Sequence, residues 1–192
     1  MRTFVVYSET ASTAPFIRDL KAAGRIDILL HSIISALFAS NTFRDDVELH
    51  LILMGPPNAP RHIMIKYDKD NTISKKDLKK LIEIALRRCK PGKLIEAHPG
   101  VFVDDKTIEN LVEDFSKENK EIFILDGAGE NIKQIDKKKF KEAVFILGDH
   151  DGFDKQVKKF LKKNCNRLSL GPQIYFTSQA ITIINYEIDN II

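Results

Sequence analysis

The stretch RLSLGPQIYFTSQAIT, residues 167–182, decides the fold. It predicts a short buried strand at 168–170, a turn at Gly171 and Pro172, and the beginning of an apolar helix. Because proline donates no backbone hydrogen bond, we expect this turn to leave backbone N–H and C=O groups unpaired at a sheet edge. Ligands of open α/β sheets bind at such an edge, so we expect the functional site here.

Two earlier stretches repeat the pattern of an apolar run that ends in a glycine-containing turn. They are IFILDGAG, residues 122–129, and VFILGDHDG, residues 144–152. Each predicts a strand followed by a turn where the glycines begin. Three such strand ends in the C-terminal half predict one composite pocket at the carboxyl edge of the sheet.

The rest of the chain alternates between strand and helix patterns. Strands are expected at 3–7, 48–54, 61–65, 122–125, 144–147 and 167–170, and helices at 25–40, 74–88, 107–118, 154–164 and 177–191. This alternation predicts an α/β fold with a mostly parallel sheet and helices on both faces.

Length and composition set ordinary bounds. A chain of 192 residues with 43% hydrophobic content can bury one sizeable core, which predicts a single domain over 1–192. The net charge of +3 does not by itself indicate a nucleic-acid partner. Basic residues do gather at 75–93 and 137–141, although solvated helix faces are the default explanation for such runs.

Compartment and membrane association follow from simple features. Cys89 and Cys165 lie far apart with no CxxC spacing, and no signal-like segment precedes the first expected strand. We therefore expect a reducing cytoplasm. The apolar stretch 26–39 is too short and too often interrupted by polar residues to cross a bilayer, so no membrane is expected.

Several familiar chemistries are not indicated. No GxGxxG follows the first strand, and the chain has no GxxxxGK[ST] or GxSxG motif. Asp149 and Asp151 resemble the start of a calcium loop, but Phe160 stands where its closing glutamate belongs. The five histidines have no metal-ligand spacing, so we expect no metal. What remains is a cofactor held mainly by backbone groups of irregular turns.

The last expected helix is apolar on nearly every side. Its apolar residues, with the chain end that follows, are Ala180, Ile181, Ile183, Ile184, Tyr186, Ile188, Ile191 and Ile192. Such a helix is buried on more than one side. It either lies inside the core of its own chain or forms the interface of a homodimer.

Five motifs, in order along essentially the whole chain, carry a resemblance. They are AGRID at 23–27, FRDDV at 43–47, MGPPNAP at 54–60, LGDHDG at 147–152 and LSLGPQIYFTSQAITII at 168–184. Together they closely resemble the archaeal tRNA pseudouridine-54 N1-methyltransferases of the TrmY family, in the SPOUT class. The resemblance implies a C-terminal trefoil knot, S-adenosylmethionine bound within about 122–192, a homodimer, and tRNA as the partner.

Carried over residue by residue, the resemblance implies a cofactor site. Its residues would be Leu125, Gly148, Leu170, Gly171, Pro172, Gln173, Ile174, Tyr175 and Ala180. Turns interrupted by glycine and proline suit an adenine ring, because they offer backbone groups without long side chains in the way. Some relatives carry a cysteine where this chain has Ala180, so no thiol can assist at that position.

Arg25 and Asp27 resemble the GRxD pattern of the family and are the catalytic candidates. Methylation at N1 requires loss of a weakly acidic N–H proton, and the developing negative charge spreads over the ring carbonyls. Arg25 would bind phosphate or stabilise that anion, and Asp27 would orient the base or accept the proton. The alternative is that Asp27 only complements the dipole at the start of a helix.

Arg44 is the first RNA-contact candidate, and Arg2, Arg61 and His62 are weaker ones. Solvated surface arginines are the ordinary alternative. Two other functions stay open. The chain could be a noncatalytic RNA-binding protein on the same scaffold, which Ala180 favours, or it could methylate a different RNA nucleotide.

Overall fold

The computed structural model describes residues 1–40, 42–69 and 73–191. Its elements, in chain order, are β1 (Arg2–Ser8), α1 (Ile26–Leu37), β2 (Phe38–Ala39), β3 (Thr42–Phe43), β4 (Val47–Leu53), β5 (Arg61–Lys66), the 3-10 helix η1 (Lys75–Asp77), α2 (Leu78–Arg88), β6 (Ile95–His98), β7 (Val101–Asp104), α3 (Ile108–Lys117), β8 (Ile122–Asn131), the 3-10 helix η2 (Lys137–Phe140), β9 (Val144–Gly148), α4 (Lys155–Asn164), β10 (Asn166–Ser169) and α5 (Thr177–Asp189). All eleven expected elements are present, with ends shifted by a few residues.

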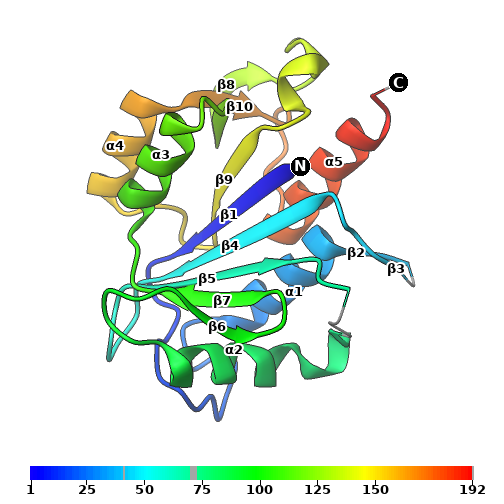
Figure 1. The fold of residues 1–192 in the computed structure, drawn as a ribbon. Coiled ribbons are helices and arrows are strands. Elements are labelled where there is room, and N and C mark those ends of the chain that lie inside the picture. Colours follow the sequence, from blue (N-terminus) through cyan, green and yellow to red (C-terminus); the bar gives the residue numbers. More distant parts are fainter. Residues whose placement is uncertain (41, 70–72, 192) are drawn as a thin grey trace.

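One mixed sheet organises the fold, in the strand order β10-β8-β9-β1-β4-β5-β7-β6 (Figure 1). The pairs from β10 to β4 are parallel, and the pairs from β4 to β6 are antiparallel. A mostly parallel sheet is therefore confirmed. The sequence did not predict β6 and β7, because each is four residues long and only Pro99 and Gly100 separate them, too little for a periodic pattern.

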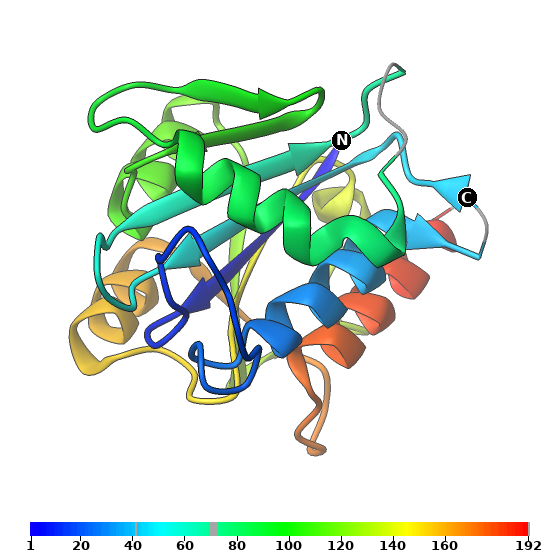
Figure 2. The ribbon, with the colours of Figure 1, turned by 90° about the horizontal axis from the view of Figure 1, so that it is seen from below.

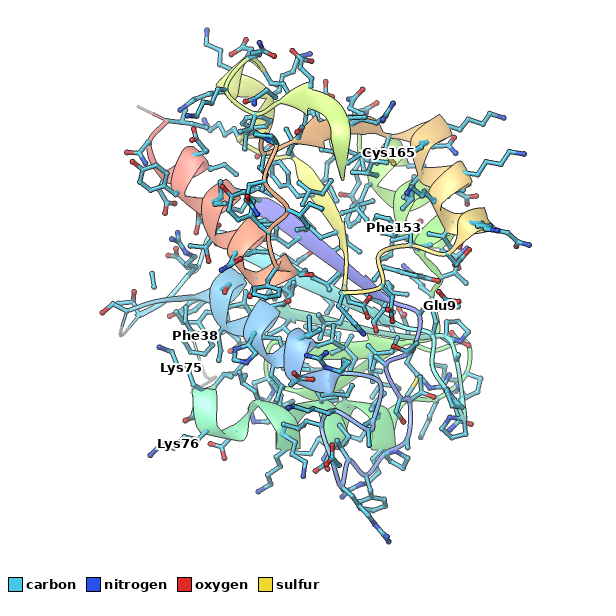
Figure 3. The ribbon with its side chains drawn as sticks, turned by 180° about the vertical axis from the view of Figure 1, so that it is seen from behind. Glu9, Phe38, Lys75, Lys76, Phe153 and Cys165 are labelled. Atoms are coloured by element: carbon cyan, nitrogen blue, oxygen red, sulfur yellow. The ribbon has the colours of Figure 1, made fainter. Side chains whose placement is uncertain are left out.

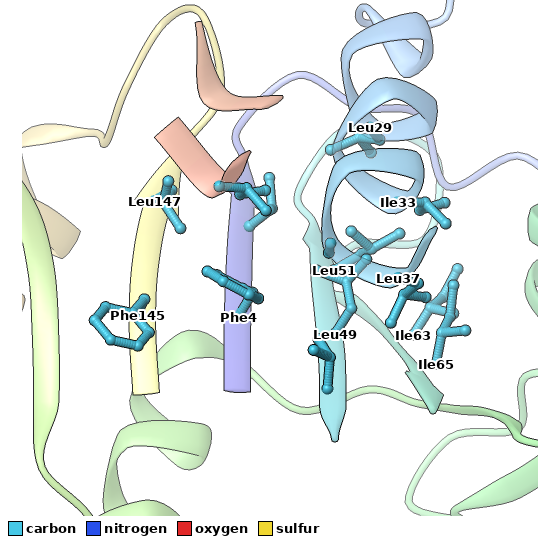
Figure 4. Packing of buried hydrophobic residues seen from close by; sticks show 14 of the residues in the cluster. Phe4, Leu29, Ile33, Leu37, Leu49, Leu51, Ile63, Ile65, Phe145 and Leu147 are labelled. Atoms are coloured by element: carbon cyan, nitrogen blue, oxygen red, sulfur yellow. The ribbon is translucent and has the colours of Figure 1, made fainter. Parts of the chain in front are cut away.

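Helices cover both faces of the sheet, as expected (Figures 1 and 2). On β1, Phe4 and Val6 point to the face that α1, α2 and α5 cover, and Val5 and Tyr7 point to the face under α3 and α4. Successive residues of a strand face opposite sides, so one apolar strand serves two cores. Figure 4 shows the first core, where α1 packs over β4 and β5.

Strand β8 differs from the expectation that it would end in a turn after 125. It pairs with β9 only from Ile122 to Ile124. Its pairing with β10 then jumps, because Arg167 is opposite Ile124 but Leu168 is opposite Glu130. Residues 125–129 therefore bulge from the sheet edge and strand pairing resumes beyond them. A Cβ at Gly129 would lie 2.5 Å from the carbonyl carbon of Arg167, so only glycine fits this return.

The terminal helix α5 lies against α1 (Figure 2). Its buried residues are Thr177, Ala180, Ile181, Ile184, Asn185 and Ile188. Asn185 Nδ2 donates to the carbonyl of Ser35 on α1 at 3.0 Å. Tyr186 on its outer side is 65% exposed, so the chain itself buries only one side of this apolar helix. Among the residues that the structure describes, no helix is both long and apolar enough to span a membrane.

Candidate cofactor and substrate site

Two adjoining hollows lie where the three strand-end turns meet. The first, of about 260 Å³, is lined by Leu125, Asp126, Gly127, Leu168, Ser169, Leu170, Gly171, Pro172, Gln173, Ile174 and Tyr175. The second, of about 290 Å³, is lined by Ile124, Leu125, Asp126, Gly127, Gly148, Asp149, Asp151, Gly152, Phe153, Lys158 and Lys162. They share Leu125, Asp126 and Gly127, which belong to the bulge of β8. The structure thus brings together all the expected cofactor residues except Ala180.

Tight backbone approaches shape this region. Gly148 ends β9 so close to the following turn that a Cβ there would lie 2.6 Å from Gly152 Cα. Thr177 Oγ1 donates to the Gly148 carbonyl at 2.8 Å, which fixes the start of α5 at the end of β9. Gly171 has a backbone φ of 110°, a value that residues other than glycine rarely adopt. The turn after β9 is therefore set by a close local approach and by one hydrogen bond from α5, a segment far away in sequence.

The loop that precedes α5 presents apolar side chains to solvent. Ile174 is 92% exposed and Phe176 is 75% exposed. Ala180, one turn later, is fully buried and packs in the first core. Ala180 thus lies on the side of α5 that faces the protein interior and outside both hollows, and its contact with the cofactor stays a prediction.

Asp126 is a charged residue of the site that the sequence reasoning missed. Its carboxylate lies 2.9 Å from Lys162 Nζ and 3.1 Å from Arg167 Nε, and it also accepts from the N–H of Ala128. Burial works to raise its pKa, but these three donors outweigh burial and hold the pKa well below its ordinary value. The sequence did contain a signal for this residue, because Asp126 directly follows the apolar strand pattern of residues 122–125.

Phe153, in the loop between β9 and α4, lines the second hollow (Figure 3). Its ring centroid lies 5.8 Å from that of Tyr7 on β1. Tyr7 in turn donates to Asp154, the N-cap of α4, at 2.7 Å. The end of β1 and the start of α4 are thereby joined at the wall of the site.

Arg25 and Asp27 form a two-pronged ion pair at the start of α1. Arg25 Nε and Nη2 each lie 3.0 Å from an oxygen of Asp27. The hydrogen bond from Arg25 lowers the pKa of Asp27, and the hydrogen bond to Asp27 raises the pKa of Arg25. The charges of Asp149 and Asp151 raise the pKa of Arg25 further, which relates this pair electrostatically to the turn after β9. Asp27 is thus ionised, but it is a weaker base than a free carboxylate.

Two of the expected RNA-contact arginines are engaged with the protein itself. Arg2 is only 6% exposed, donates to the backbone and side-chain oxygens of Asn185, and pairs with Asp46 and Asp189. Arg44 Nη1 and Nη2 lie 3.0 and 2.7 Å from the Asp189 carboxylate. For Arg2 the expectation is corrected, because burial under α5 keeps it from RNA.

Arg61 and His62 differ in exposure. Arg61 is half-buried and donates to the Pro60 carbonyl at 2.8 Å. His62 is buried and lies 2.8 Å from Asp104, so the weak expectation of an RNA contact there is corrected as well.

Asp149, His150 and Asp151 can bring one ligand atom each within 4.8 Å of one another. The Asp149 oxygens, however, already accept from Ser8 Oγ and from the N–H of Asp151. We therefore interpret this cluster as a hydrogen-bonded turn and not as a metal site, because its most buried carboxylate already accepts hydrogen bonds from the protein.

A mostly parallel sheet with helices on both faces and hollows at its strand-end turns defines a ligand-binding α/β protein. Its fold matches the crystal structure of Archaeoglobus fulgidus Nep1 bound to S-adenosylhomocysteine, with a TM-score of 0.69 and 12% identity over 100% of this chain and 99% of that one. Residues 1–191 match the family model described as "Putative SAM-dependent RNA methyltransferase". The chain therefore belongs to this family.

Curated relatives agree with the family. A protein of Thermococcus gammatolerans is 31% identical over 100% of this chain and 98% of its own length. One of Methanococcoides burtonii is 32% identical over 98% and 96%, respectively. Both are named tRNA (pseudouridine(54)-N(1))-methyltransferase. The resemblance inferred from the five motifs is confirmed.

Proposed function

We propose that this chain transfers a methyl group from S-adenosylmethionine to N1 of pseudouridine 54 in tRNA. The observation that carries the proposal is the pair of adjoining hollows, lined by the residues that the family resemblance implied, in a chain that matches its relatives over their full length. Transfer of a methyl group between two bound molecules depends chiefly on holding them in register, and strand-end turns of a rigid sheet suit that task.

The walls of the hollows fit the cofactor. The side chains of Leu125, Leu168 and Leu170 suit an adenine ring, and the turns at Gly127 and Gly171 keep side-chain bulk away from backbone groups. Bound S-adenosylmethionine supplies the electrophilic methyl group of its sulfonium. No metal is needed for this chemistry, so we propose none.

Arg25 and Asp27 would act on the base. An RNA phosphate or uridine oxygen that draws the Arg25 guanidinium away would leave the Asp27 carboxylate with a higher pKa and a free oxygen. Asp27 would then accept the N1 proton, and Arg25 would offset the negative charge on the ring. More than a third of the Arg25 side chain is exposed, so a substrate can reach it.

We further propose a homodimer that uses α5 and the loop before it. Ile174, Phe176 and Tyr186 are between 65% and 92% exposed, although each carries a large apolar side-chain surface. Large exposed apolar side chains gathered on one segment are typical of an interface. Light scattering tests this, since Phe176→Glu and Tyr186→Glu are expected to yield monomers, and dimers that persist in both variants would contradict it.

For the chain as a whole we propose a single SPOUT-type domain over 1–192, a trefoil knot within about 122–192, and a cytoplasmic location. The path after β10 supports the knot. The chain leaves the sheet edge at β10, beyond β8, and then begins α5 at the end of β9. A crystal structure traced through this segment tests it, and an unknotted trace would refute it.

The activity test uses purified protein, methyl-labelled S-adenosylmethionine, and a tRNA carrying pseudouridine at position 54. We expect 1-methylpseudouridine in the nuclease digest, and none from the same tRNA with uridine at that position. Label at another nucleotide would favour a different RNA target. A silent calorimetric titration with S-adenosylmethionine would favour the noncatalytic alternative. The feature behind that alternative, Ala180, lies in the core, so we do not adopt it.

A further inference from the structure

An exposed phenylalanine stands on the loop between β1 and α1. Phe16 is 67% exposed, while its neighbour Ile17 is 3% exposed and packs in the first core. The N–H of Ile17 donates to the Glu83 carboxylate on α2 at 2.9 Å. Because Ile17 is held inward by both contacts, Phe16 is held outward. Its exposure is a property of the folded loop.

Hydrogen bonds near its first residues hold the same loop in place. The N–H of Ser12 donates to the Ala23 carbonyl at 3.0 Å, and the N–H of Thr13 donates to the Pro56 carbonyl at 2.9 Å. Thr13 Oγ1 donates to the Gly55 carbonyl as well. The loop ends at Arg25, the candidate that would meet the RNA. Phe16 and Arg25 thus belong to one loop that hydrogen bonds hold in place.

A cation already lies against the Phe16 ring. The guanidinium carbon of Arg87, on α2, is 4.8 Å from the ring centroid. Figure 2 shows the loop approaching α2 at that end of the helix. Aromatic rings and arginine planes are the groups on which proteins stack unpaired RNA bases.

The outer side of η1 and α2 is cationic. Its exposed basic residues are Lys75, Lys76, Lys80 and Arg87. Arg88 is exposed as well, but its Nη1 donates to the Ala97 carbonyl of β6 at 2.8 Å, so it faces away from this side. Figure 3 shows Lys75 and Lys76 beyond the start of α2. Lys80 and Arg87 are seven residues apart, and so share a face of the helix at about 10 Å along its axis. The carboxylate of Glu83 between them is engaged with Ile17, and the exposed acid on these elements is Asp77.

We propose that Phe16 and this cationic side of η1 and α2 form an RNA-docking surface separate from the cofactor hollows. Phe16 stacks on an unpaired base other than the one that is methylated, and the lysines and Arg87 contact backbone phosphates. The proposal rests on the proposed function, because it states how the RNA of that reaction is held. Its partner is RNA, since the surface combines a stacking ring with a row of cations.

The test measures the affinity of tRNA for the full chain by fluorescence anisotropy at several salt concentrations. Phe16→Ala is expected to weaken binding about tenfold, and Phe16→Tyr to remain within about twofold of the unaltered protein, because a tyrosine ring still stacks. Arg87→Ala is expected to weaken binding and to reduce the salt slope by about one. The affinity for S-adenosylmethionine is expected to stay unchanged in all three.

Matched controls separate docking from general surface effects. Leu94→Ala removes another exposed apolar side chain, and Lys163→Ala removes an exposed cation on α4, across the sheet. Both are expected to bind RNA normally. If Phe16→Ala and Arg87→Ala also bind normally while the unaltered protein binds and methylates tRNA, the docking surface is refuted and the proposed function stands. If the unaltered protein binds no RNA, both fail.

Discussion

His50 Nδ1 on β4 lies 2.8 Å from His62 Nε2 on the adjacent strand β5, on the face of the sheet that α3 covers. The two rings are nearly parallel, with centroids 5.0 Å apart. The other nitrogen of His50 lies 2.7 Å from Glu48, and that of His62 lies 2.8 Å from Asp104 on β7. All four residues are at most 9% exposed. Four buried polar groups thus satisfy one another in a single chain of contacts.

Removing one of these four hydrogen-bonded side chains is expected to lower the free energy of unfolding more than a substitution at the surface does. His62→Ala leaves His50 and Asp104 buried without their partner, so we expect the free energy of unfolding to fall by about 3 kcal/mol. Urea denaturation measures it. His31→Ala, at an exposed position of α1, is the matched control and is expected to change stability by less than about 0.5 kcal/mol. Equal effects in the two variants would show that the contacts contribute little.

Asp27→Asn tests the proton-accepting role. We expect methyl transfer to slow by about a hundredfold to ten-thousandfold, because an amide cannot take the N1 proton. Calorimetry is expected to show almost unchanged affinity for S-adenosylmethionine, since Asp27 lines neither hollow. A normal rate would reduce Asp27 to a helix-terminal charge paired with Arg25.

Gly148→Ala tests the steric argument for the turn after β9. The added Cβ would lie 2.6 Å from the backbone of Gly152, so the turn must shift. We expect the Kd for S-adenosylmethionine to rise at least about tenfold and the melting temperature to drop. Gly127→Ala has open space around the new Cβ and is expected to melt near the original temperature. A Gly148→Ala protein with normal affinity would refute the close packing.

The ion pairs of Asp126 predict a pH dependence. Its pKa is lower in the folded chain than in the unfolded one, so the folded state gains stability where the unfolded carboxyl is ionised. That gain is present above about pH 4 and is lost as the pH falls through the folded pKa. Asp126→Asn is expected to cost about 1 kcal/mol at neutral pH. Thermal melts should show the two proteins converging as the pH is lowered, and a constant difference would contradict the prediction.

The thiol of Cys165 is expected to be unreactive. Burial raises its pKa to about 12, so at pH 8 only about one thiol in ten thousand is ionised. In a Cys89→Ser protein, which leaves Cys165 as the remaining thiol, iodoacetamide should alkylate the native chain slowly and the urea-unfolded chain fast. Mass spectrometry follows the reaction, and rapid labelling of native protein would show an accessible thiolate.

Several features followed from the sequence alone. The alternating apolar runs predicted the parallel strands and the helices on both faces. This was possible because hydrophobic periodicity depends only on the residues within each segment. The glycine-containing strand ends predicted where hollows would form. The short motifs from AGRID to LSLGPQIYFTSQAITII predicted the family, since their order along the chain is a property of the sequence itself.

Tertiary structure decided which polar side chains are paired within the protein and which remain accessible to a ligand or to RNA. Arg2 is held under α5 by Asn185 and Asp189, residues more than 180 positions away, and no local pattern predicts that distance. Likewise, the contact between His50 and His62 depends on the register of two strands, and the return of β8 depends on Gly129 passing the backbone of Arg167. Periodicity sets which face of an element is apolar, but only the packing of distant segments sets which polar group each side chain meets.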